Sequence, residues 1–130
     1  MAAMGRFLWI CLGGAVGTGA RYLLSDWSLR NFGPGFPWGT LAVNVIGSFL
    51  LGALMQIALA TSLLPPTLRL TLTTGVMGGF TTYSTFNYET VRYLQQSDWV
   101  GAGTYVAATL GVCLAAGALG LFAARLFVGS

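Results

Sequence analysis

The sequence contains no histidine and no lysine, and only 7% of its 130 residues are charged. A soluble domain of ordinary composition has about 25% charged residues. Because 55% of the residues are hydrophobic and the mean hydropathy is +0.75, the composition predicts a membrane protein. The lack of histidine excludes histidine-based catalysis and histidine metal sites. With no candidate nucleophile–base pair either, we do not expect an enzyme.

Acidic residues are also scarce, at three against six arginines, which gives a net charge of +3. In a soluble protein this balance would suggest a nucleic-acid partner. Here the arginines are spread singly, with no basic cluster, so we interpret them as interfacial anchors and topology signals and expect no nucleic-acid binding.

Cysteine is limited to Cys11 and Cys113, and both lie inside apolar segments. We therefore expect them to act as small hydrophobic residues rather than to form a disulfide bond. Arg6 precedes an apolar run, but no small-residue cleavage site follows it, so the sequence does not predict a signal peptide.

Long apolar segments dominate what remains. Each is near the roughly 20 residues that a membrane-spanning helix needs. The sequence predicts one domain, residues 1–130, that is an all-α bundle of four transmembrane helices with a break in the third. The expected helices cover about 7–24, 39–60, 67–94 and 99–127. A chain this short cannot enclose a substantial pore alone, which favours an oligomer in the membrane.

The arginines are divided evenly between the two sides that four crossings would create. One side carries Arg6, Arg69 and Arg125, and the other carries Arg21, Arg30 and Arg92. The positive-inside rule then has no bias to act on. This balance suggests insertion in both orientations, and hence an antiparallel dimer. A single, weakly biased topology remains the alternative.

The third segment holds an unusual polar stretch at the expected depth of the bilayer midplane. Three glycines, Gly75, Gly78 and Gly79, precede a run rich in hydroxyls and aromatic rings. Irregular polar backbone at this depth survives only when it is buried in protein or lines a water-filled path. Hydroxyls and ring edges can face an anion, whereas carbonyl oxygens freed at a break at Gly75–Gly79 can bind a cation such as Na⁺ or K⁺.

Polar residues on two other segments share helical faces. Asn44 and Ser48 are four apart, as are Tyr105, Thr109 and Cys113 in turn. Each set fits either helix packing through hydrogen bonds or the wall of a polar pathway. Arg21, at the end of the first segment, is the best-placed cation for the mouth of an anion pathway.

These residues fall into motifs that resemble the CrcB/Fluc family of small fluoride channels over essentially the whole chain. The motifs are Gly13-Gly-x-x-Gly17-x-x-x-Arg21, Trp38-Gly-Thr-Leu-x-x-Asn44-x-x-Gly47 and Thr74-Gly75-x-x-Gly78-Gly79-x-Thr81-Thr82-Tyr83-Ser84-Thr85-Phe86. The third motif is the most specific of these.

The resemblance implies a dual-topology antiparallel homodimer with two fluoride pores and a central Na⁺. It places the Na⁺ on the main-chain carbonyls of Gly78 and Thr81 from both subunits. Asn44 matches the family's pore asparagine and Arg21 its vestibule arginine. The family's two stacked rings match Tyr83 and Phe86, and its hydroxyl track matches Ser84 and Thr85. Its pore tyrosine on the fourth helix matches Tyr105. We add Ser48 and Thr109 from the faces described above.

Two positions depart from the family pattern. Tyr83 stands where phenylalanine is usual, which adds a phenolic hydroxyl, and Cys113 stands where serine is expected, which weakens a donor. The expected function is passive, fluoride-selective export across the cell membrane. Two alternatives remain: a proton-coupled exporter that uses Glu89, the one acid near this region, and a non-conducting accessory subunit.

Overall fold

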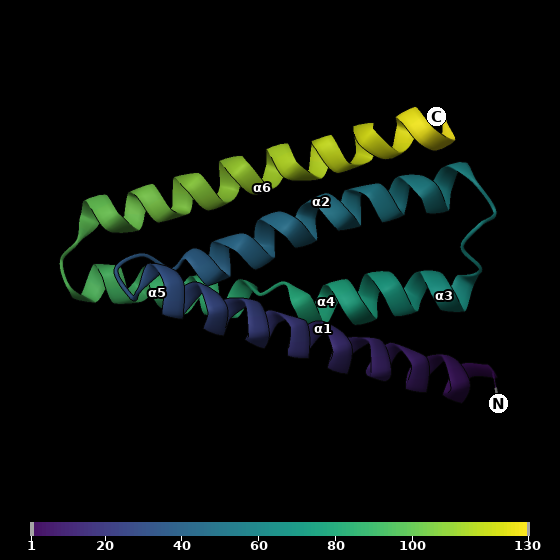
Figure 1. Ribbon diagram of the computed structural model, residues 1–130, viewed down its shortest axis with the longest axis horizontal. Helices are drawn as coiled ribbons and strands as arrows, with labels where there is room; N and C mark the ends of the chain where they lie inside the picture. Colours follow the sequence, from purple (N-terminus) through teal and green to yellow (C-terminus); the bar gives the residue numbers. More distant parts are fainter. Residues whose placement is uncertain (1, 130) are drawn as a thin grey trace.

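The computed structural model describes residues 2–129, and within that range the chain is helical with no strand. The elements are α1 (Ala2–Phe32), α2 (Trp38–Ala60), α3 (Pro66–Leu70), the π-helix η1 (Thr71–Met77), α4 (Gly78–Phe80), α5 (Tyr83–Gln95) and α6 (Trp99–Val128). The chain runs back and forth along one long axis, and both ends lie at the same end of the molecule (Figure 1). The helix α2 packs mainly on α6, whereas α1 packs on η1, α4 and α2.

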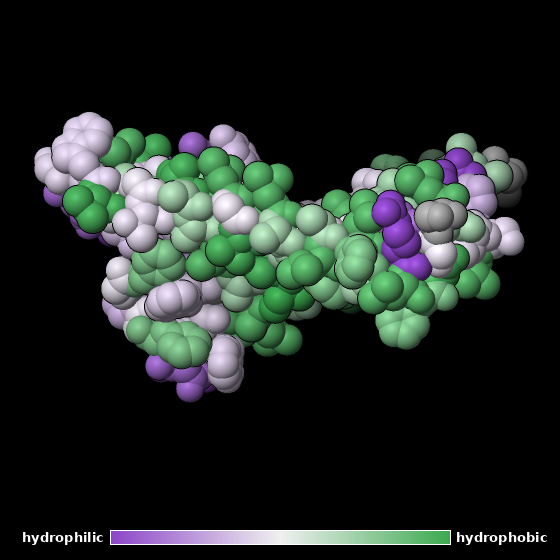
Figure 2. Space-filling view, turned by 90° about the horizontal axis from the view of Figure 1, so that it is seen from above, coloured by the Kyte–Doolittle hydropathy of each residue, from purple (hydrophilic) through white to green (hydrophobic). Residues whose placement is uncertain are grey.

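Among residues 2–129, three helices are long and apolar enough to cross a membrane: α1, α2 and α6. Large hydrophobic side chains on their surfaces are exposed, for example Val16 at 65%, Leu59 at 76% and Leu114 at 75%. Hydrophobic residues cover the middle of the face in Figure 2, and hydrophilic residues gather toward its two ends. This distribution suits a multi-pass membrane protein, because lipid tails accept apolar side chains that water does not.

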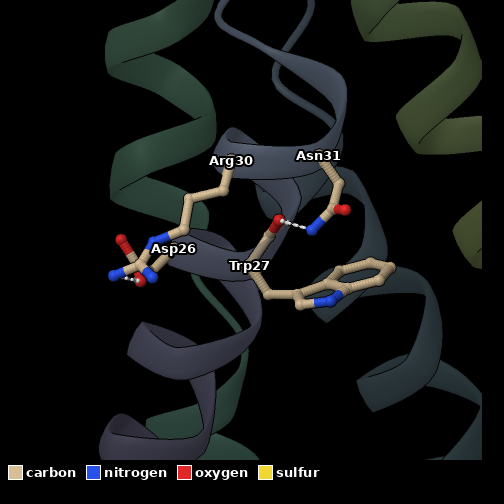
Figure 3. A network of polar contacts seen from close by, with 4 residues as sticks. All are labelled: Asp26, Trp27, Arg30 and Asn31. Carbon is tan, nitrogen blue, oxygen red and sulfur yellow. Dashed lines mark hydrogen bonds and ion pairs between the residues drawn. The ribbon is translucent and has the colours of Figure 1, made fainter.

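The first helix is longer than the apolar segment 7–24, since α1 continues to Phe32. The stretch from Asp26 was expected to belong to a linker, and that expectation is wrong. Two contacts support the extra turns (Figure 3): Arg30 forms an ion pair with Asp26 at 2.8 Å, and Asn31 Nδ2 donates to the Trp27 carbonyl at 2.8 Å. Pairs four residues apart stabilise a helix modestly. The true linker to α2 is only residues 33–37.

The glycine-rich stretch is helical, which corrects the expected break at Gly75–Gly79. The chain is a π-helix through Met77 and an α-helix from Gly78 to Phe80. The extended residues come later, at Thr81 and Thr82, where ψ is 162° and 117°. Low intrinsic helix propensity is overridden here because Gly75 and Gly79 pack against α1.

Close backbone contact explains why these positions are glycine. A Cβ atom added at Gly13 would lie 2.6 Å from the Thr71 carbonyl oxygen, and one at Gly17 would overlap the Val76 carbonyl oxygen. Such small residues let membrane helices approach closely. The small residues Ala107, Gly111 and Ala115 make no such approach, because all three are exposed and nothing lies within 4 Å of a Cβ built at Gly111. On α6, Gly120 instead approaches the backbone of Phe49.

Candidate functional site

The extended backbone at Thr82 is held by the side chain of Asn44. The Thr82 amide donates to Asn44 Oδ1 at 2.8 Å, and Asn44 Nδ2 donates to the Thr82 carbonyl at 3.0 Å. The asparagine amide therefore replaces the helical partners that Thr82 lacks. This arrangement matters because an unpaired backbone group away from water is costly. The helix then restarts at Tyr83, with the Thr82 hydroxyl accepting from the Thr85 amide at 3.2 Å.

A cavity of 420 Å³ opens beside this pair, and we call it the Asn44 cavity. No charged residue lines it, so its polar surface consists of amide, hydroxyl, thiol and backbone groups. Six of the sequence-predicted residues and the second divergent position lie in its wall: Asn44, Ser48, Thr81, Tyr83, Phe86, Thr109 and Cys113. The structure thus brings together side chains from α2, the α4–α5 break, α5 and α6.

One hydroxyl in the wall of the Asn44 cavity, that of Thr109, has no hydrogen-bond partner among residues 2–129. Thr109 is 6% exposed, and its Oγ1 is the one buried side-chain polar atom among residues 2–129 without a hydrogen-bond partner. Threonine hydroxyls in helices commonly bond back to the preceding turn, as Thr90 does to Phe86 O at 2.9 Å. The Thr109 hydroxyl is thus available to a polar species in the Asn44 cavity.

Two aromatic rings of the break region lie in sequence along α5. The centroids of Tyr83 and Phe86 are 6.0 Å apart, with the rings tilted by 58°. Phe86 is 9% exposed, but Tyr83 is 77% exposed. Tyr83, with its extra phenolic hydroxyl, therefore lies at the surface of the chain rather than in its core.

Tyr105 is fully buried and lies behind Phe86. Its ring meets Phe86 edge-on at 5.1 Å, and its hydroxyl donates to Glu89 Oε1 at 2.8 Å. Tyr105 was predicted as a pore residue, whereas Glu89 was considered only as a proton carrier. The sequence analysis missed the contact between the Glu89 carboxylate and the Tyr105 hydroxyl. The two residues belong to separate segments, and sequence spacing does not show which side chains of separate segments meet.

A second cavity, of 660 Å³, lies on the other side of these rings, and we call it the Arg21 cavity. Arg21, Thr85, Glu89 and Arg92 all contribute to its wall. Arg21 lies well inside α1 rather than at its end, and its Nε donates to the Gly79 carbonyl at 2.9 Å. A guanidinium at the carboxyl end of α4 stabilises the partial negative charge there.

Three predicted residues lie outside both cavity walls: Ser84, Tyr105 and Gly78. Ser84 is exposed on α5, whereas Thr85 lines the Arg21 cavity. Gly78 lies just before the break and Thr81 lies within it. The next amide, that of Thr82, donates to Asn44 and so is not available to these carbonyl oxygens. Among the hydrogen bonds of residues 2–129, neither carbonyl has a donor. Such oxygens are the ligands that hard cations prefer.

Comparison with known proteins shows the family of this chain. The profile of the family described as "CrcB-like protein, Camphor Resistance (CrcB)" matches residues 8–121. The chain belongs to the CrcB family. Relatives of this CrcB-family chain include proteins named "Fluoride-specific ion channel FluC". The one from Sorangium cellulosum (strain So ce56) is 62% identical over 122 residues, covering 94% of this chain and 96% of the relative.

Two further relatives carry the same name. The protein of Anaeromyxobacter dehalogenans (strain 2CP-1 / ATCC BAA-258) is 57% identical over 125 residues, covering 96% of each chain. That of Geobacter metallireducens (strain ATCC 53774 / DSM 7210 / GS-15) is 50% identical over 116 residues, covering 89% of this chain and 94% of the relative. The family resemblance carried by the motifs is thereby confirmed.

Proposed function

We propose that this CrcB-family protein is a passive, fluoride-selective channel of the cell membrane that exports cytoplasmic fluoride and has no enzymatic activity. The observation that carries the proposal is the composition of the Asn44 cavity. Its polar groups are donors from Asn44 and hydroxyl side chains, no carboxylate lines it, and the Thr109 hydroxyl has no partner among the described residues. The names of the relatives point to the same ion.

Fluoride is small and strongly hydrated, so a pore that selects it must replace lost water with many fixed donors. Hydroxyl and amide donors in the Asn44 cavity and the positive edges of the Tyr83 and Phe86 rings can supply such contacts. Chloride is larger and accepts weaker hydrogen bonds, so its fit to the same donors is poorer. Arg21 in the second cavity favours the entry of anions over cations.

We further propose that two copies of the chain assemble as an antiparallel homodimer with two pores, in which residues 66–95 form the remaining membrane crossing. The surface around the break supports this arrangement. Tyr83 at 77% exposure and Leu114 at 75% exposure both line the Asn44 cavity, so a second copy placed there would complete its wall. The equal division of arginines between the two sides is compatible with both orientations.

The carbonyl oxygens of Gly78 and Thr81 fit a structural Na⁺ at the centre of that dimer. They have no donor among residues 2–129, and Gly78 is exposed on the subunit surface. Within the same range no group of three or more Cys, Asp or Glu side chains could hold a metal, so main-chain oxygens are the available ligands. A bound Na⁺ would supply positive charge that satisfies these carbonyls and joins the two subunits.

Fluoride efflux from proteoliposomes tests the function. Purified protein should release fluoride, followed with a fluoride electrode, at a rate that far exceeds chloride release from matched vesicles. The rate should not depend on an imposed pH gradient, because a passive channel needs no proton partner. Equal chloride release, dependence on the pH gradient, or no release by the purified protein would each contradict the proposal.

A further inference from the structure

The linker between α1 and α2 is short and firmly held. Gly33 has φ of +75°, which a glycine adopts readily, and its amide donates to the Leu29 carbonyl at 2.9 Å. Pro34 and Pro37 restrict the backbone further. At the far end the Trp38 amide donates to the Phe36 carbonyl at 2.8 Å. The ring of Phe36 is therefore presented from a rigid segment rather than a loose loop.

This linker is also tied to α5. The Tyr93 hydroxyl donates to the Gly35 carbonyl at 3.4 Å, and the Tyr93 and Tyr105 rings lie 6.1 Å apart. The Phe36 ring meets Tyr105 edge-on, with centroids 5.4 Å apart and planes at 82°. Edge-on pairs of this kind are favourable beyond the area that they bury.

Phe36 thereby joins a row of rings that runs from the wall of one cavity to the wall of the other. Phe36 lines the Arg21 cavity, Phe86 lines the Asn44 cavity, and Tyr105 contacts both rings while being fully buried. The row therefore links a residue of one cavity wall to a residue of the other. Its geometry therefore decides where the Tyr105 hydroxyl and the Phe86 edge are held.

We propose that Phe36 is a positioning residue for ion selection: from the α1–α2 linker it fixes the ring of Tyr105. This inference rests on the proposed channel function. Within residues 2–129, Tyr105 pairs with the rings of Phe36, Phe86 and Tyr93, and its hydroxyl donates to Glu89. An aliphatic side chain at position 36 would leave one side of the ring without its edge contact. Small displacements of positioned groups have large effects on rates.

Fluoride and chloride efflux from proteoliposomes, measured on the full chain, tests the proposal. Phe36→Leu should lower the fluoride rate about fivefold and narrow the fluoride-to-chloride ratio, in keeping with the loss of an aromatic pair. Phe36→Tyr keeps a ring and should stay within about twofold of the wild type. Phe32→Leu is the matched control, since Phe32 packs on Trp27 and Trp38 and forms no ring pair with Tyr105.

A double-mutant cycle separates positioning from a general loss of stability. In a Tyr105→Leu background, Phe36→Leu should cause no further loss of rate, because its effect acts through Tyr105. Should Phe36→Leu not purify as a monodisperse species, Phe36→Met carries the same comparison, because its unbranched side chain adapts to an irregular gap.

Either of two results overturns the inference. One is a wild-type fluoride rate and selectivity in Phe36→Leu. The other is that Phe36→Leu lowers the fluoride rate by the same factor in the wild-type and the Tyr105→Leu backgrounds. A wild-type protein that released no fluoride would instead overturn the proposed function itself, and this inference with it. The two failures are distinguishable because the first requires a conducting wild type.

Discussion

The side-chain amide of Asn44 forms hydrogen bonds with both backbone groups of Thr82, at 2.8 and 3.0 Å, across 38 positions of sequence. The sequence left two interpretations of this asparagine open, as a helix–helix contact or as a pathway donor. In the structure Asn44 forms a contact between segments through its bonds to Thr82. It also lines the Asn44 cavity, where it could serve as a pathway donor. Asn44 Nδ2 has a second hydrogen, which remains available to an ion.

Asn44→Asp should abolish fluoride conduction. A carboxylate would repel an anion and would also face the Thr82 carbonyl without a hydrogen to donate. Leaving a buried carbonyl unpaired costs about 1–3 kcal/mol, so the variant should also be less stable. Fluoride efflux and thermal unfolding check both effects. Asn31→Asp, which changes the same group at an exposed helix end, is the control. Near wild-type flux in Asn44→Asp would remove Asn44 from the pathway.

Phe86→Ile should reduce fluoride flux sharply while the protein elutes as the wild type does on size exclusion. The side chain stays apolar and large, but the ring edge that can face an anion is lost, together with the contact to Tyr105 at 5.1 Å. Phe7→Ile, on an exposed face of α1, controls for the substitution itself. Unchanged flux in the α5 variant would reject the role of the ring edge.

Thr109→Val separates function from stability. Because the Thr109 hydroxyl has no partner among the described residues, its removal should leave the free energy of unfolding unchanged or slightly higher. Fluoride flux should nevertheless fall, since the cavity loses a donor. Thr104→Val, at an exposed position of the same helix, should change neither quantity. A clear loss of stability with normal flux would mean that Thr109 is structural.

Gly17→Ala should destabilise the packing of α1 on η1. The added Cβ would overlap the Val76 carbonyl oxygen, and overpacking of this kind costs about 1–3 kcal/mol. Gly19→Ala is the matched control, because nothing lies within 4 Å of a Cβ built there. Thermal unfolding in detergent should show a lower midpoint for position 17 alone. Equal midpoints would mean that the two helices can separate at little cost.

Removal of Na⁺ should weaken the dimer. If the carbonyls of Gly78 and Thr81 hold the ion, replacing Na⁺ by a large organic cation should lower the unfolding midpoint and increase the monomer fraction, and returning Na⁺ should reverse both. Ligand binding stabilises the state that binds it, so the midpoint should rise with Na⁺ concentration. Thr81→Ser keeps the carbonyl and should respond as the wild type does. A midpoint independent of Na⁺ would contradict the site.

How much of the site could be foreseen varies with the kind of interaction. The motif around Thr81, Thr82 and Phe86 identified the family and the candidate residues, because residue type and spacing are local properties. The first helix was expected to end soon after Arg21, but it continues to Phe32, since helix length depends on tertiary contacts as well as on local sequence. The partnership of Tyr105 with Glu89 joins α6 to α5, and no local pattern indicates that their side chains meet.

Composition alone determined that this chain belongs in a membrane, because 7% charged residues cannot cover a soluble surface. The hydrophobic segments likewise determined its helical class. Only the tertiary structure decided where the third segment is interrupted. The glycines favour disorder by themselves, but α1 packs against them and keeps them helical, while Asn44 on α2 satisfies the backbone of Thr82. A break in a membrane helix forms where another helix offers replacement hydrogen bonds, and that is a property of the packed bundle rather than of the segment.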